Sequence, residues 1–348
     1  MDRIGRIISW MTLSVALTAC GSEGGGDTVD AQPVVPDAFI PIPSSPTPAT
    51  ISDSGLFVDV AGEVLAPGVR PFEPAYALWT DGAEKHRWIY LPPESTIDTS
   101  NMDRWVLPVG TKVWKEFRRN GVRVETRLLS KTGPNEWWTR AYVWNDTQND
   151  AVVAPNGVGD VLGTGHEIPP TQACMDCHGN VSDMAVGFSA VLLDHDGPGV
   201  TLDDLVAEGR LSHPPARNGD SYFTLPGSRT DRDALGYLHA NCSTCHNPDS
   251  MVYQYGDAVM DFRLYTDGLG SLESTAAFKT AVCGEIRQQL AGAEQIIVPG
   301  DPTTSAVFMR MNLRGNGDQM PKIGSDIIDD LGVEIMWLWI NSLSACPQ

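Results

Sequence analysis

The chain has 348 residues, of which 42% are hydrophobic, enough to build one or two domains with apolar cores. Its 44 acidic residues outnumber its 24 basic residues, which gives a formal net charge of −20 at pH 7. This charge disfavours binding to nucleic acid or anionic lipid and could steer basic protein partners, although solubility alone is a sufficient reason for it.

The first 20 residues have the features of an export signal. Arg3 and Arg6 precede an apolar run over residues 7–17, which is too short to span a bilayer. The run ends in Leu-Thr-Ala-Cys, and Cys20 is followed by Gly21, the pattern of a bacterial lipobox. We therefore expect cleavage before Cys20, acylation of its thiol and anchoring at the outer membrane, facing the periplasm or the cell exterior. The alternative is an ordinary secretory signal in which Cys20 has no role.

Residues 21–50 are rich in Gly, Pro, Ser and Asp and contain few side chains that could form a core. This composition predicts a disordered tether.

Residues 51–165 carry the pattern of an antiparallel, mainly-β domain, which we expect to be sandwich-like. Seven of the ten tryptophans lie between Trp79 and Trp144, among runs of β-forming residues. Asn120-Gly121 predicts a two-residue type I′ turn between two strands. That turn would pair Val113 with Leu128 and Trp114 with Arg127 on adjoining strands. Further strands are expected over residues 137–144 and within residues 77–91.

The second half of the chain contains the same short motif twice, CMDCH at 174–178 and CSTCH at 242–246. Cys-x-x-Cys-His is the attachment signature of c-type haem. In it, both thiols form thioethers with the porphyrin and the histidine binds the iron. The sequence therefore predicts two covalent haem groups, attached through Cys174 and Cys177 and through Cys242 and Cys245, with His178 and His246 as proximal ligands.

Two other uses of these cysteines, a redox pair and a structural zinc site, fit the sequence less well. A thioredoxin-like redox pair requires a βαβ setting that the sequence lacks, and it does not account for the histidines. A structural zinc site would join pairs that start at Cys174 and Cys242, which are 68 positions apart. That separation is far beyond the spacing of about 15–20 residues usual for such sites.

The distal iron ligands are less clearly marked. Of the six methionines after His246, Met320 alone lies in a Gly-, Asn- and Asp-rich loop, and Pro321 follows it. We therefore expect Met320 to be the distal ligand of the second haem. For the first haem the choice stays open among Met184, His239, His195 and His213. Met184 and His239 are the preferred candidates.

Helical patterns follow residue 230. Thr230 and Asp231 could cap a helix leading into the second motif, and Asp301-Pro302 could open another. Residues 330–343 predict an amphipathic closing helix. We expect a first haem segment over residues 166–230 and a cytochrome c-like domain over 231–348. The whole is then a multidomain α+β chain with an all-α dihaem part.

Seven cysteines are present: one for the lipid, four for haem, and the pair Cys283 and Cys346. In an oxidising compartment this last pair is expected to form a disulfide.

About residues 70–345 resemble a family of secreted dihaem c-type cytochromes whose physiological role is not established. The resemblance lies in the haem motifs and in eight short segments: WTDGAEK at 79–85, LPVGT at 107–111, ETRLL at 125–129, YVWN at 142–145, IPP at 168–170, YLHAN at 237–241, VPGDP at 298–302 and MP at 320–321. It implies electron transfer and gives no substrate.

The leading hypothesis is a membrane-anchored electron-transfer protein that passes single electrons between redox partners. A dihaem peroxidase-like enzyme with one open iron is the rival. A third hypothesis is a redox-sensing module whose β domain binds a ligand.

Overall fold

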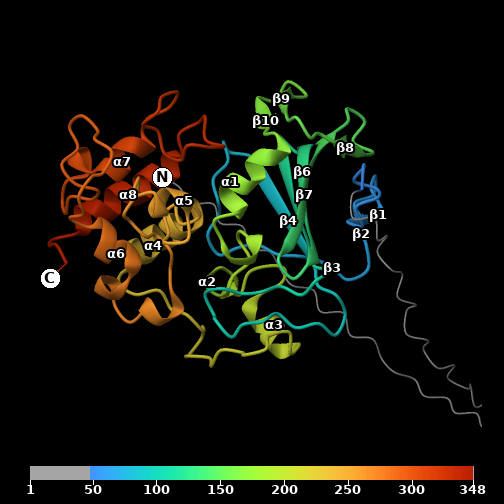
Figure 1. Ribbon diagram of the computed structural model, residues 1–348, viewed down its shortest axis with the longest axis horizontal. Helices are drawn as coiled ribbons and strands as arrows, with labels where there is room; N and C mark the ends of the chain where they lie inside the picture. Colours follow the sequence, from blue (N-terminus) through green and yellow to red (C-terminus); the bar gives the residue numbers. More distant parts are fainter. Residues whose placement is uncertain (1–47, 348) are drawn as a thin grey trace, which may run out of the picture. The chain divides into compact units, whose positions relative to one another are not determined.

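A six-stranded antiparallel sheet, in the order β3-β4-β5-β6-β7-β8, forms the centre of the protein (Figure 1). The computed structural model describes residues 48–347, which belong to one unit, residues 40–348. The predicted signal peptide, Cys20 and most of the predicted tether lie outside the described residues.

Residues 48–347 contain ten strands, six of them in the central sheet. Their bounds are β1 Phe57–Asp59, β2 Val64–Leu65, β3 Val69–Pro71, β4 Glu84–Tyr90, β5 Lys112–Arg119, β6 Val122–Gly133, β7 Glu136–Trp144, β8 Ala151–Val153, β9 Val158–Val161 and β10 His166–Ile168. The strands β1 with β2 and β9 with β10 form two separate two-stranded ribbons.

The predicted turn between β5 and β6 is confirmed, because Asn120 and Gly121 both have positive φ, 51° and 78°. The predicted register is wrong. A bulge between Phe117 and Arg118 shifts the pairing by one residue. An inserted residue of this kind moves every later side chain to the other face of its strand relative to the partner.

The shifted register decides which side chains share a face of the sheet. Trp114 is paired with Leu128, and Lys115 is paired with Arg127. Arg87 of β4 is in turn paired with Lys115. One face of the sheet therefore carries a row of cations at its centre, whereas the other carries the large apolar side chains.

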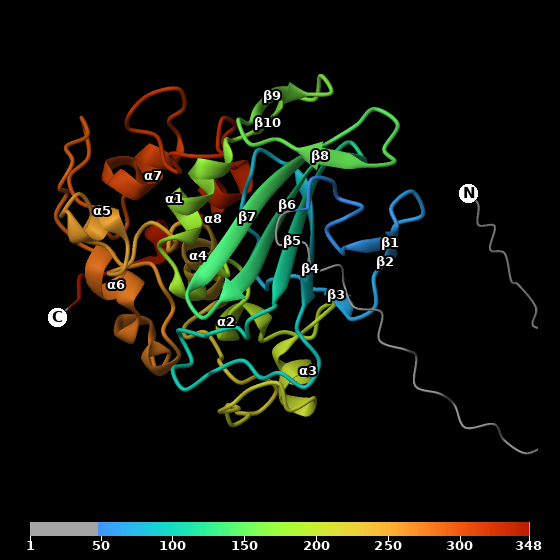
Figure 2. The same cartoon turned by 45° about the vertical axis from the view of Figure 1, so that its right-hand side comes forward.

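The apolar face packs against the segment that contains β1 and β2, which lies on that side of the sheet in Figure 2. Trp114, Tyr142 and Trp144 are almost fully buried there. The opposite face packs against α2 and α3, with Phe188 and Leu193 in its core.

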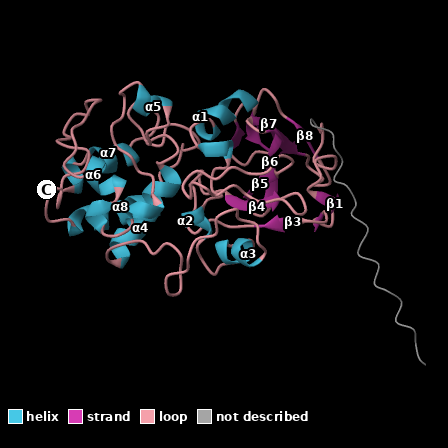
Figure 3. Ribbon diagram, turned by 60° about the horizontal axis from the view of Figure 1, so that its bottom comes forward, coloured by secondary structure: helices cyan, strands magenta, loops and turns pink. Residues whose placement is uncertain are grey.

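The helices are short except for two. Their bounds are α1 Cys174–His178, α2 Ala190–Leu193, α3 Leu202–Ala207, α4 Arg229–Asn241, α5 Met251–Gln254, α6 Ala276–Ala281, α7 Ala306–Met311 and α8 Asp330–Ser342. In Figure 3, α4, α6, α7 and α8 lie together, apart from the strands. Their shared core includes Leu238 of α4, Phe278 of α6 and Trp339 of α8.

Local signals set the ends of the two long helices. Ser228 caps α4 in a capping box with Asp231, two residues before the predicted cap at Thr230. Asp329 caps α8, and its side chain accepts a hydrogen bond from the backbone N–H of Gly332. Asp301 caps only a 3-10 turn over Pro302–Thr304, after which α7 begins at Ala306.

The predicted fold class, a β sandwich followed by an all-α cytochrome c-like domain, is wrong. The structure has 24% helix and 23% strand around one antiparallel sheet, and no cytochrome-like helical domain or haem-binding cleft is evident in the described part of the chain. No second sheet covers the first, because short helices, loops and a small ribbon do so. Gly- and Pro-rich connections also divide most of the expected helical region into pieces of four to six residues. The predicted domain boundaries after residues 165 and 230 stay predictions.

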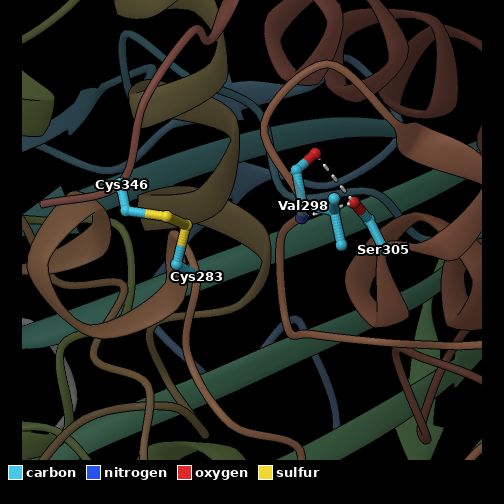
Figure 4. The surroundings of a disulfide bond; sticks show 4 residues. All are labelled: Cys283, Val298, Ser305 and Cys346. Carbon is cyan, nitrogen blue, oxygen red and sulfur yellow. Dashed lines mark hydrogen bonds between the residues drawn. A yellow bond between two sulfur atoms is a disulfide. The ribbon is translucent and has the colours of Figure 1, made fainter.

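Cys283 and Cys346 lie at disulfide distance, as the sequence predicted, with 1.99 Å between their Sγ atoms and 5.6 Å between their Cα atoms (Figure 4). The bond ties the chain after α6 to the C-terminal segment after α8. Nearby, the backbone N–H of Val298 donates a hydrogen bond to the Ser305 hydroxyl, at 2.8 Å.

Candidate functional site

The two Cys-x-x-Cys-His motifs occupy different local structures. The first makes up the whole of α1, and a single 3-10 turn over Thr171–Ala173 precedes it. That turn packs against β7, and Thr139 of β7 is hydrogen-bonded to the Cys174 thiol. The second motif begins where α4 ends, because Cys242 is the C-terminal capping residue of that helix.

The structure brings the two motifs together. The thiols of Cys177 and Cys245 lie close together, and this proximity together with burial raises the pKa of Cys177. The side-chain amide of Asn247 also donates to the backbone carbonyl of Asn180, at 3.3 Å, so a second contact joins the segments that follow the motifs. Cys174, Cys177, Cys242 and Cys245 form no disulfide.

His178 is oriented through its Nδ1 atom, which lies 2.6 Å from the backbone carbonyl oxygen of Met184. Since a carbonyl oxygen only accepts hydrogen bonds, Nδ1 carries the proton and Nε2 keeps its lone pair. This is the tautomer that a proximal histidine needs to bind iron. Burial lowers the pKa of His178 to about 4, and the charges of Lys115 and Arg127 add to this effect.

The loop that supplies this carbonyl is fixed to the sheet by Asp183. Its carboxylate accepts hydrogen bonds from the Lys131 ammonium, at 2.7 Å, from Trp137 Nε1, at 2.8 Å, and from the backbone N–H of Leu107, at 2.5 Å. Asp183 also has a φ of 51°, in the left-handed region. The loop therefore holds a defined position behind the His178 ring.

His246 has a different surrounding. Its Nδ1 atom is buried and has no hydrogen-bond partner among the described residues. Its ring packs edge-on against the Phe262 ring, with 5.6 Å between the ring centroids. Burial lowers the pKa of His246 to about 4, with a further contribution from the charge of Arg310. The backbone N–H of Met320 donates to the Arg310 carbonyl oxygen, at 3.0 Å. No hydrogen bond joins Met320 directly to His246 within the described residues, so Met320 stays a predicted ligand.

The other candidate ligands of the first iron occupy three kinds of environment. The backbone N–H of Leu264 donates to His239 Nδ1, at 3.2 Å, so the proton of a neutral His239 is on Nε2 and that atom is a donor, not a ligand. His213 is exposed and His195 is half-buried, with its Nε2 atom 2.7 Å from the Glu73 carbonyl oxygen. Met184 contributes its carbonyl to the Nδ1 side of His178 and packs its side chain on the core beside α2.

The sheet contributes residues that the sequence did not single out. The positive charge of Arg127 acts to lower the pKa of Cys174, Cys177 and His178. Its guanidinium is paired with the buried Glu125. Glu125 in turn lies 2.9 Å from His166 Nε2. The first motif therefore lies near the charged side chains of the sheet. The bulge in β5 places these side chains on that face, and no local sequence signal indicates it.

A cavity of about 100 Å³ lies between the sheet, the second motif and the segment that follows the first motif. Its walls include Lys115 of β5, Ser182 after the first motif, and His239 and Ser243 around the second. Pockets for organic ligands usually measure roughly 300–1,000 Å³. A porphyrin at either motif therefore requires the surrounding side chains to move.

The first motif has the donor atoms that a covalent haem would use. No group of three or more His, Cys, Asp or Glu side chains is placed to hold a bare metal ion in residues 48–347. The sheet is antiparallel, unlike the parallel βαβ setting of a thioredoxin-like pair. Two adjacent thiols and a histidine with its Nε2 lone pair directed away from its carbonyl partner match the first motif's predicted role.

Comparison with known proteins gave no significant match to a family model, a curated protein or a solved structure. Across the described residues, no helix combines the length and apolar character needed to cross a membrane.

Proposed function

We propose that the protein is a dihaem c-type cytochrome that transfers single electrons between redox partners. The observation that carries the proposal is the pair of Cys-x-x-Cys-His motifs, whose thiols Cys177 and Cys245 are in contact. Haem groups attached through neighbouring thiols would themselves be neighbours, an arrangement suited to passing electrons from one iron to the other.

The chain would hold each group through defined residues. Cys174 and Cys177 would attach the first haem, and Cys242 and Cys245 the second, with His178 and His246 as the proximal ligands. When bound, the iron supplies a centre that changes its charge by one electron without proton chemistry. The protein orients His178 through the Met184 carbonyl, and both histidine rings are half-buried, which limits the access of water to them.

Haem content tests the proposal directly. The chain, produced in a host that attaches c-type haem, should gain the mass of two haem groups. The Cys174→Ser/Cys177→Ser variant and the Cys242→Ser/Cys245→Ser variant should each lose one. As a control, a Cys283→Ser/Cys346→Ser variant should keep both. A parent protein without covalent haem would refute the assignment.

Spectroscopy of the oxidised protein separates electron transfer from the rival activity. Two low-spin ferric signals indicate that both irons have six ligands, as an electron carrier requires. A high-spin signal from one iron indicates an open coordination position and supports the peroxidase-like alternative.

We further propose that the mature chain is anchored by lipid at Cys20, as the short apolar segment before it indicates. Two or more acyl chains give durable membrane binding, whereas one does not. A Cys20→Ser variant should be released from the membrane fraction or left unprocessed. A fully mature variant that stays in the membrane fraction would contradict the anchor.

A further inference from the structure

Two cations, Arg87 and Lys115, belong to the row of cations on one face of the sheet and form no ion pair within the described residues. They are opposite each other in the register of β4 and β5, and both line the cavity described above. No side-chain hydrogen bond or ion pair is formed by either residue within the described chain, apart from the contact of the Lys115 ammonium with the Phe117 ring at 4.9 Å. Only 9% of the Arg87 surface is exposed, and Lys115 is half-buried.

Other acids nearby in the described chain form no ion pair with these two cations. The buried Glu125 acts to raise the pKa of Lys115, but its carboxylate is paired with Arg127. The charge of Glu73 acts to raise the pKa of Arg87, but Glu73 is exposed and forms no ion pair with it. Arg263, also in the cavity wall, is already paired with Asp249 at 2.8 Å. Asp103 is the one acid that lines the cavity as described, and burial raises its pKa. The Arg87 and Lys115 charges therefore face the cavity without compensation.

This arrangement is costly without a bound anion. Burial lowers the pKa of Arg87 to about 10, and burial together with Arg87 and Arg127 lowers that of Lys115. Adjacent like charges repel more strongly where water is excluded. Buried charges in folded proteins are usually paired or hydrogen-bonded.

His239 adds a third donor to the same cavity. Its Nδ1 accepts from the Leu264 backbone N–H, which leaves a proton on Nε2. A volume of about 100 Å³ accommodates a carboxylate group with one or two waters, because a water molecule occupies about 30 Å³ in the liquid.

We propose that Arg87 and Lys115 bind the carboxylate of an anionic ligand in this cavity. The carboxylate has two sources: a propionate of the haem at the first motif, or a small free carboxylate such as acetate. The first source rests on the proposed function, whereas the second does not. The haem propionate is the favoured source, because the charge of Lys115 acts to lower the pKa of both His178 and Cys177, which indicates that Lys115 and the first motif are near each other.

The test uses the full chain carrying its haem groups, with the variants Lys115→Met and Arg87→Gln. Lys112→Met is the matched control, because Lys112 lies on the same strand but donates to the Ser54 carbonyl on the opposite face. Two quantities are measured: the reduction potential of each haem, and the affinity for acetate from its effect on thermal unfolding.

If a propionate is bound, Lys115→Met should shift the reduced-to-oxidised ratio of one haem about tenfold toward the oxidised form, which is 59 mV for one electron. The other haem and the control should change far less, and acetate should not stabilise the parent. If a free carboxylate is bound, acetate should stabilise the parent, and each variant should weaken its binding at least about tenfold.

The proposal is overturned if neither quantity differs between the two variants and the Lys112→Met control. The haem count of the parent protein reports on the proposed function alone. Should that count be zero, the acetate measurement still decides whether the two cations form an anion site.

Discussion

Glu125 is fully buried in β6, and it holds two side chains at once. Arg127 Nε lies 2.6 Å from one carboxylate oxygen, and His166 Nε2 lies 2.9 Å from the other. Burial raises the pKa of Glu125, but Arg127 and His166 lower it by more, so the pKa falls below its usual value of 4.5. This single side chain therefore fixes the orientation of the cation beside the first motif.

We expect Glu125→Gln to reduce the free energy of unfolding by roughly 3–5 kcal/mol at neutral pH, because Arg127 would be left without its counterion. The stability that Glu125 contributes is present above about pH 4.5 and is lost as the pH falls through its lower folded-state pKa. The variant should therefore lose stability less steeply in acid. Urea unfolding between about pH 7 and pH 3 measures both effects. Glu136→Gln, an exposed change on β7, should have neither.

Met320 is the candidate for the distal position of the second haem. Replacing it by Ala should remove the iron–sulfur absorption band at the red end of the spectrum for one haem and lower the potential of that haem, because thioether ligation favours reduced iron. Met251→Ala is a suitable control, since Met251 is 61% exposed. A Met320→Ala protein with the spectrum and both potentials of the parent would show that another ligand is used.

At the scale of elements, the segment after α1 is held by its attachment to the sheet rather than by a helix of its own. Asp183 joins it to Lys131 of β6 and Trp137 of β7, and the next residue, Met184, supplies the carbonyl that orients His178. Asp183 is thus a positioning residue that acts on the histidine through the backbone.

We expect Asp183→Asn to destabilise the protein by about 3 kcal/mol, because the Lys131 ammonium, 99% buried, would lose its carboxylate. If the proposed haem groups are bound, the variant should also alter the low-spin ferric EPR signal of the first haem and leave that of the second unchanged. The double variant Asp183→Asn/Lys131→Met should regain part of the stability, since no lone buried charge remains. An unchanged EPR signal in the single variant would limit Asp183 to a structural role.

At the scale of the whole molecule, the helical part is closed by a covalent link. The disulfide between Cys283 and Cys346 spans a sequence separation of 63 residues and encloses α7 and α8. The two helices also share an apolar core with α4, which leads into the second motif. Loosening the end of the chain is therefore expected to affect the surroundings of the second motif more than those of the sheet.

Replacing both cysteines by serine should cost about 4 kcal/mol of unfolding free energy in the chain-entropy model, because the unfolded chain regains its freedom. Denaturant unfolding of the oxidised parent, the reduced parent and the double variant measures this. The last two should agree with each other. A double variant as stable as the oxidised parent would show that the bond contributes nothing.

Features that depend on neighbouring residues could be predicted from the sequence. The Asn120-Gly121 turn, the strand that ends at Trp144 and the closing helix from Asp330 follow from turn chemistry and periodicity. The pairing of Cys283 with Cys346 followed from cysteine count and compartment. None of these required knowledge of how distant segments pack.

Only the tertiary structure decided the fold class and the surroundings of the site. The bulge beside Phe117 turned Lys115 and Arg127 to one face, where a regular ladder would have separated them. Long-range packing brought together two motifs that start 68 residues apart and placed the first against the sheet. Such outcomes are decided by competing contacts between remote segments, because one inserted residue reverses the faces of a strand without leaving a local mark in the sequence.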